Sequence, residues 1–316
     1  MLERYFSLTE NGTTPQREVV AGVTTFLTMA YIIFVNPSIL KDAGMDQGAV
    51  FVATCLAAAV GSALMGLVAN YPIALAPGMG MNAFFTYTVV VGMGYSWQIA
   101  LGCVFLSGVM FVALSLFKIR EWIINAVPRS LKMSIAAGIG FFLGFIALKN
   151  AGMVVAHPVT FVTLGDVTGL KQILAVLGFI LILALDHRRV PGAVMIAILG
   201  ITLAALLLGL ESWHGLAAAP PSLAPTFLQM DLAGALNPAL FGVIFTLLFL
   251  DIFDTAGTLI GTGHAAGLLD DRGRLPRIGR ALIADSTATV IGAALGTSNT
   301  TTYIESLAGI KEGGRT

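Results

Sequence analysis

Two stretches far apart in this chain place helix breakers and polar residues inside otherwise apolar segments. They are residues 76–85 (APGMGMNAFF) and residues 296–306 (GTSNTTTYIES). A bilayer core offers no water to free N–H and C=O groups, so irregular backbone at membrane depth must line a cavity or be buried in protein. Two interrupted segments at corresponding places in two halves of a chain are typical of a solute site near the bilayer midplane.

The composition is that of a polytopic membrane protein. The 316 residues are 57% hydrophobic and 11% charged, and the mean hydropathy is +0.89, whereas soluble domains carry about 25% charged residues. Most of the surface should therefore face lipid, and we expect the bilayer, not a nucleic acid, as the macromolecular environment. Residues 1–17 contain no apolar core of a signal peptide.

No disulfide or metal pattern is visible in the sequence. Cys55 and Cys103 lie in apolar runs, where they should be small buried hydrophobes. The four histidines fall in predicted loops or at span ends, so we expect no metal and no cofactor.

The apolar runs predict an all-α protein with about ten membrane crossings. A spanning helix needs about 20 mostly apolar residues. Two shorter runs, 81–93 and 302–310, follow the broken stretches and are predicted to be half-helices, so that the third and tenth elements are discontinuous. The eight full spans are predicted at 19–40, 48–69, 97–117, 133–148, 172–186, 191–209, 237–262 and 279–295.

The distribution of basic residues predicts the orientation. With the N-terminus in the cytoplasm, 14 of the 17 Lys and Arg fall on the inside, and the exceptions are Lys41, Lys149 and Lys171. This asymmetry satisfies the positive-inside rule. We therefore expect a multi-pass protein of the cytoplasmic membrane whose inside segments are 1–18, 118–132, 186–190, 264–280 and 311–316.

The positions of the broken elements predict inverted repeats. If seven crossings form one repeat, the tenth crossing is the third element of a second repeat, and because seven is odd that repeat enters from the opposite side. The repeats would be residues 1–236 and residues 237–316. By this count the second repeat lacks four crossings, so we expect the chain to be C-terminally truncated; a natural ten-crossing protein is the alternative.

Two carboxylates lie in the eighth span. Asp251 and Asp254 are three residues apart and share one helix face, which Thr255 and Thr258 extend. An ionisable residue at a helix centre costs roughly 2.5–3.5 kcal/mol on insertion scales, so each is a functional candidate. Two carboxylates this close do not both ionise at low cost, which makes them candidates for proton coupling. The alternative is that Asp251 braces helix packing.

Further polar candidates lie in the two half-helices. Glu305 follows a Thr-rich stretch that includes Thr302, and a helix N-terminus there would offer N–H groups to a ligand. Asn82 occupies a similar place in the first half-helix, where a plain N-cap is the alternative. Asp285, near the cytoplasmic end of the ninth span, is predicted to be structural.

Aromatic residues near the broken elements could stack on a flat ligand. We include Phe84 among the residues predicted to bind the ligand. Phe85, Phe253 and Tyr303 lie nearby, although a single Phe in a membrane protein more often packs or faces lipid.

Five motifs carry a family resemblance: residues 13–18 (TTPQRE), 21–32 (AGVTTFLTMAYI), 76–85, 251–258 (DIFDTAGT) and 301–306 (TTYIES). In this order, and over the whole chain, they resemble the AzgA-like purine permeases. These form the hypoxanthine/guanine/adenine branch of the nucleobase–cation symporters, within the nucleobase/ascorbate transporter family.

The resemblance implies a fourteen-span fold with a core domain, which holds the substrate between the third and tenth elements, and a gate domain that mediates homodimerisation. It implies proton-coupled uptake of hypoxanthine, guanine or adenine. Position by position, it implies that Asp254 and Glu305 bind the purine and that Asn82 shapes the site, while Asp251 stands in a matching motif without an assigned role. Asp254, Glu305 and Asp251 are the candidates for proton coupling.

Three alternatives remain at this point. The chain could be a truncated permease fragment without activity. It could be an anion transporter of the same inverted-repeat fold, although such a site should present few carboxylates. An intramembrane aspartyl protease needs two Asp on separate helices and a Gly-x-Gly-Asp signature, which this sequence lacks.

Overall fold

A computed structural model describes residues 2–116, 129–188, 190, 192–212, 215, 218–270 and 275–316. The chain divides into two compact units, one formed by Met1–Pro128 with Pro220–Thr316 and the other by Arg129–Ala219. This division by packing is separate from the predicted division into repeats at residue 236, which stays a prediction.

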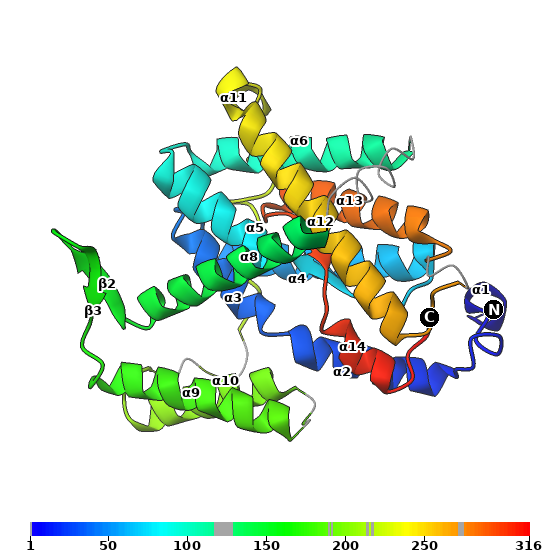
Figure 1. Cartoon of the computed structure of the whole chain (residues 1–316), viewed down its shortest axis with the longest axis horizontal. Coiled ribbons are helices and arrows are strands. Elements are labelled where there is room, and N and C mark those ends of the chain that lie inside the picture. The colour runs from blue at the N-terminus through cyan, green and yellow to red at the C-terminus, as the bar shows by residue number, and fades with distance from the viewer. Residues whose placement is uncertain are drawn as a thin grey trace. The chain divides into compact units, whose positions relative to one another are not determined.

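The first unit contains most of the elements (Figure 1). In chain order they are α1 (Leu2–Phe6), α2 (Pro15–Met29), α3 (Ile32–Lys41), α4 (Gln47–Leu64), the π-helix η1 (Met65–Ala69), β1 (Leu75–Pro77), α5 (Met79–Ala83), the π-helix η2 (Phe84–Gly92), α6 (Trp97–Leu116), α11 (Leu232–Ala235), the 3₁₀-helix η3 (Pro238–Leu240), α12 (Phe241–Ala265), α13 (Ile278–Leu295), β4 (Thr300–Thr302) and α14 (Ser306–Lys311).

The described part of the second unit has five elements. They are α8 (Arg129–Asn150), the hairpin of β2 (Val154–His157) and β3 (Phe161–Leu164), α9 (Leu170–His187) and α10 (Ala193–Leu207). Helices α9 and α10 pack against each other.

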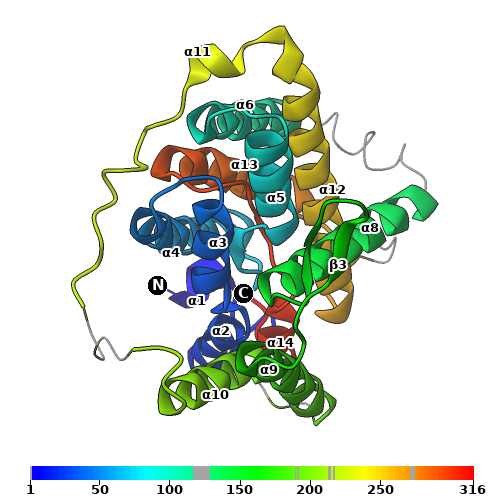
Figure 2. The same ribbon diagram turned by 90° about the vertical axis from the view of Figure 1, so that its left-hand side faces the viewer.

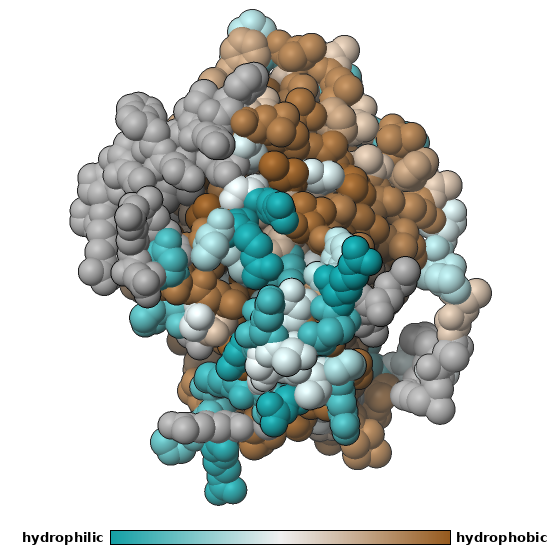
Figure 3. All heavy atoms as spheres, turned by 90° about the vertical axis from the view of Figure 1, so that its right-hand side faces the viewer, coloured by the Kyte–Doolittle hydropathy of each residue, from teal (hydrophilic) through white to brown (hydrophobic). Residues whose placement is uncertain are grey.

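The helices are those of a membrane protein. Within the described residues, six helical stretches are long and apolar enough to cross a bilayer. Large apolar side chains are exposed on them, among them Phe26 at 58%, Phe179 at 61% and Leu116 at 63%. Figure 3 shows apolar side chains covering much of one face, with hydrophilic side chains gathered in one region. An apolar surface of this extent requires lipid or protein as its solvent.

Every predicted span coincides with a helical stretch, but the first one is interrupted. Helix α2 ends at Met29 and α3 begins at Ile32, where the bonds from Ile33 N–H to the Ala30 carbonyl and from Phe34 N–H to the Tyr31 carbonyl replace the regular α-helical pattern. Tyr31 lies at this break and its hydroxyl contacts Glu305, as described below.

Three long helices form the packed centre of the first unit. Figures 1 and 2 show α4, α13 and α6 side by side, and α13 contacts both of the others. Small residues permit this close approach: a Cβ on Gly61 of α4 would lie 3.1 Å from Ala288 of α13, and one on Gly108 of α6 would lie 3.0 Å from Thr289. Close backbone approach therefore positions everything that these helices carry.

The two broken stretches meet as a short antiparallel pair of strands. Leu75 lies opposite Thr302, Ala76 opposite Thr301 and Pro77 opposite Thr300. Each strand runs into a short helix, α5 after β1 and α14 after β4. The all-α prediction is confirmed as far as the helical class is concerned, but it missed this pair and the β2–β3 hairpin, because strands of three or four residues leave no alternating pattern to detect.

A substitution at Gly309 of α14 can test how this helix packs against α2. A Cβ at Gly309 would overlap the Ala21 carbonyl oxygen and the Thr25 hydroxyl of α2. We predict that Gly309→Ala lowers stability by about 1–3 kcal/mol, the usual cost of overpacking, measured as a lower Tm in detergent. Gly242→Ala is the matched control, because a Cβ on Gly242 in α12 meets nothing within 4 Å. Equal Tm values for both variants would contradict the packing described here.

Candidate functional site

The broken elements satisfy their backbone groups against each other. Beyond the paired residues, Gly78 N–H donates to the Asn299 carbonyl at 2.9 Å and Tyr303 N–H donates to the Ala74 carbonyl at 3.0 Å. The Tyr303 hydroxyl also donates to the Pro77 carbonyl at 2.5 Å. Irregular backbone is therefore sustained here without water, and both chain crossings are held at one place.

Glu305 stands where β4 leads into α14 and is half-buried. The Tyr31 hydroxyl donates to Glu305 Oε1 at 2.5 Å, and the Thr28 hydroxyl donates to the Glu305 carbonyl at 3.4 Å. The Glu305 side chain makes no capping hydrogen bond to α14. Its second carboxylate oxygen is thus free of the capping role that would otherwise explain an acidic residue at this position.

The two carboxylates of α12 have different surroundings. Asp254 is exposed and lies close enough to Glu305 for the two side chains to interact electrostatically. Asp251, one helical turn earlier, is 1% exposed. Among the described residues, neither Asp254 nor Glu305 forms an ion pair with a Lys, Arg or His. Asp254 and Glu305 can therefore present acceptors to a ligand, whereas Asp251 cannot reach one in this conformation.

Asp251 belongs to a buried polar cluster behind the strands. Asp251 Oδ2 accepts from the Thr289 hydroxyl at 3.1 Å and from the Asn299 amide at 3.1 Å. The Thr255 hydroxyl donates to Asp285 Oδ2 at 2.9 Å and lies 2.9 Å from the Thr301 hydroxyl. The cluster joins α12 and α13 to β4.

Asp285 is fully buried, and its Oδ1, like Asp251 Oδ1, has no hydrogen-bond partner. The two carboxylates interact electrostatically across α12 and α13. Two buried carboxylates with only neutral partners are costly unless a proton is shared between them. The prediction that Asp285 is structural is compatible with its burial, but its neighbours also make it part of the polar cluster.

Asn82 lies in a second buried network. Its amide nitrogen donates to Asn36 Oδ1 at 2.6 Å, and its carbonyl oxygen accepts from the Ser298 hydroxyl. Asn36 in turn donates to the hydroxyls of Thr54 at 2.6 Å and Thr297 at 2.8 Å. Both ends of the Asn82 side chain are occupied and it is 0% exposed, so it ties α3, α4 and the two broken elements together.

The remaining candidates have little open surface. Thr302 is 3% exposed and its hydroxyl reaches the Thr255 carbonyl at 3.5 Å. Phe84 is half-buried and packs against the apolar cluster that includes Phe85, Val89 and Leu101. The structure brings Asp254, Glu305 and Thr302 to one region, while Asn82 and Asp251 lie behind it.

Sequence reasoning missed several residues of the site. Asn36 and Tyr31 both lie in the first span, where a polar side chain inside an apolar run was the available signal. Ser298 and Asn299 were within the second broken stretch but carried no prediction of their own. Ser298 pairs with Asn82, 216 positions away, and the Asn299 amide pairs with Asp251, 48 positions away on another helix. Spacing along one helix does not show such contacts.

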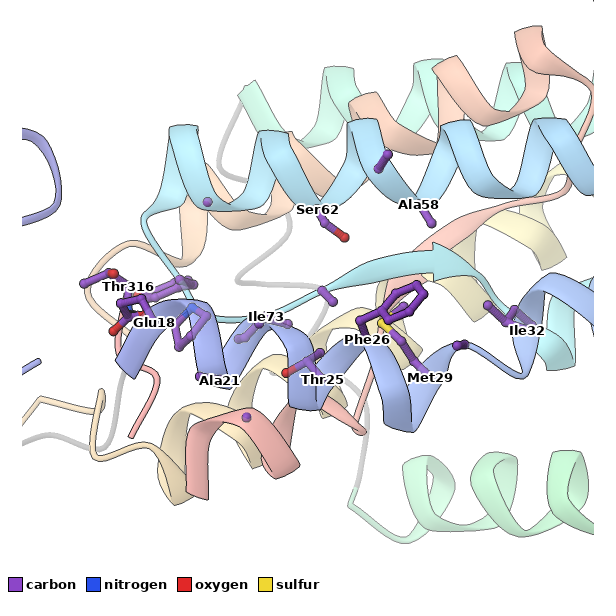
Figure 4. A pocket seen from close by; sticks show the side chains of 18 of the residues that line it. Glu18, Ala21, Thr25, Phe26, Met29, Ile32, Ala58, Ser62, Ile73 and Thr316 are labelled. Atoms are coloured by element: carbon purple, nitrogen blue, oxygen red, sulfur yellow. Dashed lines mark hydrogen bonds between the residues drawn. The ribbon is translucent and has the colours of Figure 1, made fainter. Parts of the chain in front are cut away.

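The described residues contain no group of three or more His, Cys, Asp and Glu side chains arranged to hold a metal ion. A cavity of about 450 Å³ lies between α2, α3 and α4 (Figure 4), and none of the predicted site residues lines it.

Comparison with known proteins identifies the family. A family model described as "Permease family" matches residues 16–316. The chain belongs to this permease family. The permeases similar to it include Adenine permease AdeP of Escherichia coli, 49% identical over the whole of this chain and 71% of AdeP. Guanine/hypoxanthine permease PbuG of Bacillus subtilis is 48% identical over 99% of this chain and 74% of PbuG.

These relatives confirm the resemblance to AzgA-like nucleobase permeases, and they make the chain a multi-pass membrane protein of a transporter family.

A solved structure shares the permease fold. The transmembrane domain of a cyanobacterium bicarbonate transporter, BicA, matches with a TM-score of 0.68 over 95% of this chain and 78% of that one. At 16% identity this likeness concerns the fold alone.

A substitution at Asn36 can test the buried hydrogen-bond network that includes Asn82. We predict that Asn36→Ala lowers stability by about 1–3 kcal/mol, because the Asn82 amide and the Thr297 hydroxyl lose their buried partner. Thermal unfolding in detergent measures the effect. Asn150→Ala, an exposed position on α8, is the control and should stay within about 0.5 kcal/mol. Indistinguishable variants would show that the network does not hold the broken elements.

Proposed function

We propose that this permease imports purine nucleobases such as hypoxanthine, guanine or adenine across the cytoplasmic membrane by proton symport. The observation that carries the proposal is the placement of Asp254 on α12 and of Glu305 at the start of α14, because these helices contact each other beside the paired broken stretches. The printed names of AdeP and PbuG, adenine and guanine/hypoxanthine permeases, support the choice of purines.

The chemistry of the site suits a purine. A purine ring offers N–H donors along its edge, and carboxylate oxygens accept such bonds with about twice the strength of neutral partners. Tyr31 fixes one oxygen of Glu305 through its 2.5 Å bond, which leaves the other oxygen for the ring. Asp254 is exposed and can accept from a second N–H group. Asn82 supports the site from behind rather than by contact.

The same carboxylates supply the proposed proton coupling. Two interacting carboxylates with no compensating cation within the described part of the chain favour protonation of one of them. A purine that binds one protonation state more tightly than the other then links its binding to that of the proton. Asp251 and Asp285 are buried behind Asp254 and Glu305 and add two further carboxyl groups to this region. We propose Asp254 or Glu305 as the proton-accepting group at the site.

The remaining parts of the proposal concern architecture. We propose an N-terminus in the cytoplasm, on the distribution of Lys and Arg, and two inverted repeats, supported by the antiparallel pairing of β1 with β4. Homodimerisation, with core and gate domains, is proposed from the family resemblance. An anion carrier is the weaker candidate, because exposed Asp254 and half-buried Glu305 would repel an anion.

Glu305 is the first residue to test. We predict that Glu305→Gln keeps the fold but weakens purine binding at least tenfold, because a carboxylate acceptor becomes a weaker, partly donating amide. Binding is measured by scintillation proximity with labelled hypoxanthine, guanine and adenine. Glu312→Gln makes the same chemical change at the exposed end of the same helix and should leave affinity unchanged. Equal losses in both variants would reject the site.

Proton coupling is tested separately in proteoliposomes that contain this chain joined to the part of AdeP outside the matched region. We predict that an inward proton gradient drives purine accumulation and that adding purine alkalinises the outer medium, as followed with a pH-sensitive dye. Asp254→Asn should abolish both effects while Asp42→Asn, on an exposed residue outside the site, preserves them. Purine accumulation that does not depend on the proton gradient would contradict proton symport.

Whether this chain transports without further spans is tested by uptake in permease-deficient cells. We predict that the chain completed with the part of AdeP outside the matched region takes up labelled purine. The chain by itself should reach the membrane without uptake. Uptake by both would show that ten crossings suffice, and uptake by neither would reopen the choice of solute.

A further inference from the structure

Tyr31 gives Glu305 a hydrogen-bond donor of its own. The Tyr31 hydroxyl donates to Glu305 Oε1 at 2.5 Å, and the Tyr31 side chain is buried. Tyr31 lies between α2 and α3, and α14, which begins after Glu305, packs against α2. A hydroxyl donates to an ionised carboxylate at about 2.5–2.7 Å, in bonds roughly twice as strong as those between neutral groups. The contact therefore stabilises the negative charge on Glu305.

A proton on Glu305 would disturb this contact. In the described part of the chain, the Tyr31 hydroxyl has no hydrogen-bond partner besides Glu305. A proton on Oε1 would leave the Tyr31 hydrogen without an acceptor, and a buried donor without a partner is costly. A proton on Oε2 would turn the acceptor into a neutral acid and weaken the bond. Protonation of Glu305 is therefore unfavourable at either oxygen.

The hydroxyl beside Asp254 is committed to another residue. Asp254 lies next to the Thr301 hydroxyl, which has one hydrogen to donate. The Thr255 hydroxyl donates to Asp285 Oδ2 at 2.9 Å. In the 2.9 Å contact between the Thr255 and Thr301 hydroxyls, Thr301 must then be the donor. The Thr301 hydrogen thus points to Thr255, and Asp254 lacks the dedicated donor that Glu305 has.

The charged neighbours of the two carboxylates differ in the same sense. Asp254 and Glu305 interact electrostatically, so ionisation of one disfavours ionisation of the other. In the described part of the chain, the other titratable side chains that interact with this pair are Tyr31, Tyr303, Asp251 and Asp285. Both tyrosines interact with Glu305, whereas the two buried aspartates interact with Asp254. Acidic neighbours on this side favour a proton on Asp254.

We propose that Tyr31 is a positioning residue that keeps Glu305 ionised, so that Asp254 holds the proton at the site. The consequence for transport rests on the proposed function: Glu305 accepts an N–H group of the purine, while the coupled proton enters and leaves at Asp254. A nucleobase without an N–H group for Glu305 would bind weakly. The assignment of the charge itself does not depend on which solute is carried.

The first experiment follows both protonation steps by infrared difference spectroscopy, without a solute, on this chain joined to the part of AdeP outside the matched region. The carboxylic C=O bands are assigned by their loss in Asp254→Asn and in Glu305→Gln. On acidification we expect the Asp254 band to appear at higher pH than the Glu305 band. In Tyr31→Phe the Glu305 band should appear about one pH unit higher than in the unmodified protein, as expected for the loss of one hydrogen bond to a charged group.

Tyr5→Phe is the matched control, because the Tyr5 hydroxyl donates to the Leu67 carbonyl at 2.6 Å, away from the site. It should leave both bands unchanged. A monofluorinated tyrosine at position 31 keeps the ring and donates more strongly, so it should move the Glu305 band to lower pH. The proposal is overturned if the Glu305 band appears before the Asp254 band, or if neither change at position 31 moves it.

A second measurement follows purine binding to the same joined protein against pH, by scintillation proximity. In Tyr31→Phe the loss of affinity on acidification should begin about one pH unit higher. In a Glu305→Gln background, Tyr31→Phe should have no further effect. An unchanged pH dependence in Tyr31→Phe would contradict the role of Tyr31. Absence of purine binding by the unmodified protein would instead reject the proposed function, and the infrared bands would still decide where the proton is held.

Discussion

The requirement that backbone polar groups find partners inside a dry bilayer governs this structure. A helix that stops at membrane depth leaves N–H and C=O groups that cost several kcal/mol each when unpaired. Two interrupted elements solve the problem together, because β1 and β4 exchange backbone hydrogen bonds that neither could make alone. The pairing holds the two broken stretches together and positions the side chains that lie next to the strands.

The side chains behind the strands form an unusual interior. Two carboxylates, Asp251 and Asp285, are buried with hydroxyls and an amide as partners. Packing alone does not account for them, since apolar residues of similar size would cost less. Burial of charge-bearing groups in a membrane protein is retained where protons or solutes pass, and their distance from open surface separates them from the contact role given to Asp254 and Glu305.

Much of this could be predicted from the sequence, and the part that could not has a physical reason. Spans follow from the length of apolar runs, and the broken elements follow from Gly, Pro and Thr where helix was expected. Asp254 and Glu305 stood out because charge in an apolar run is costly. The strand pairing, the Asn36–Asn82 contact and the Tyr31–Glu305 bond depend on residues far apart in the chain, and no local pattern encodes which of them meet.

Asn36 joins α3 to α4 and to both broken stretches through side-chain bonds that no solvent can replace. Elements linked in this way cannot separate to admit a solute, because separation would leave several buried polar groups without hydrogen-bond partners. Under the proposed transport function, access from either side of the membrane would change by displacement of this whole group of linked elements. The free-energy cost of such a displacement depends on the outer surface of the linked elements, which faces lipid and the rest of the protein. Variants on that surface would alter the turnover rate while leaving affinity for the solute intact.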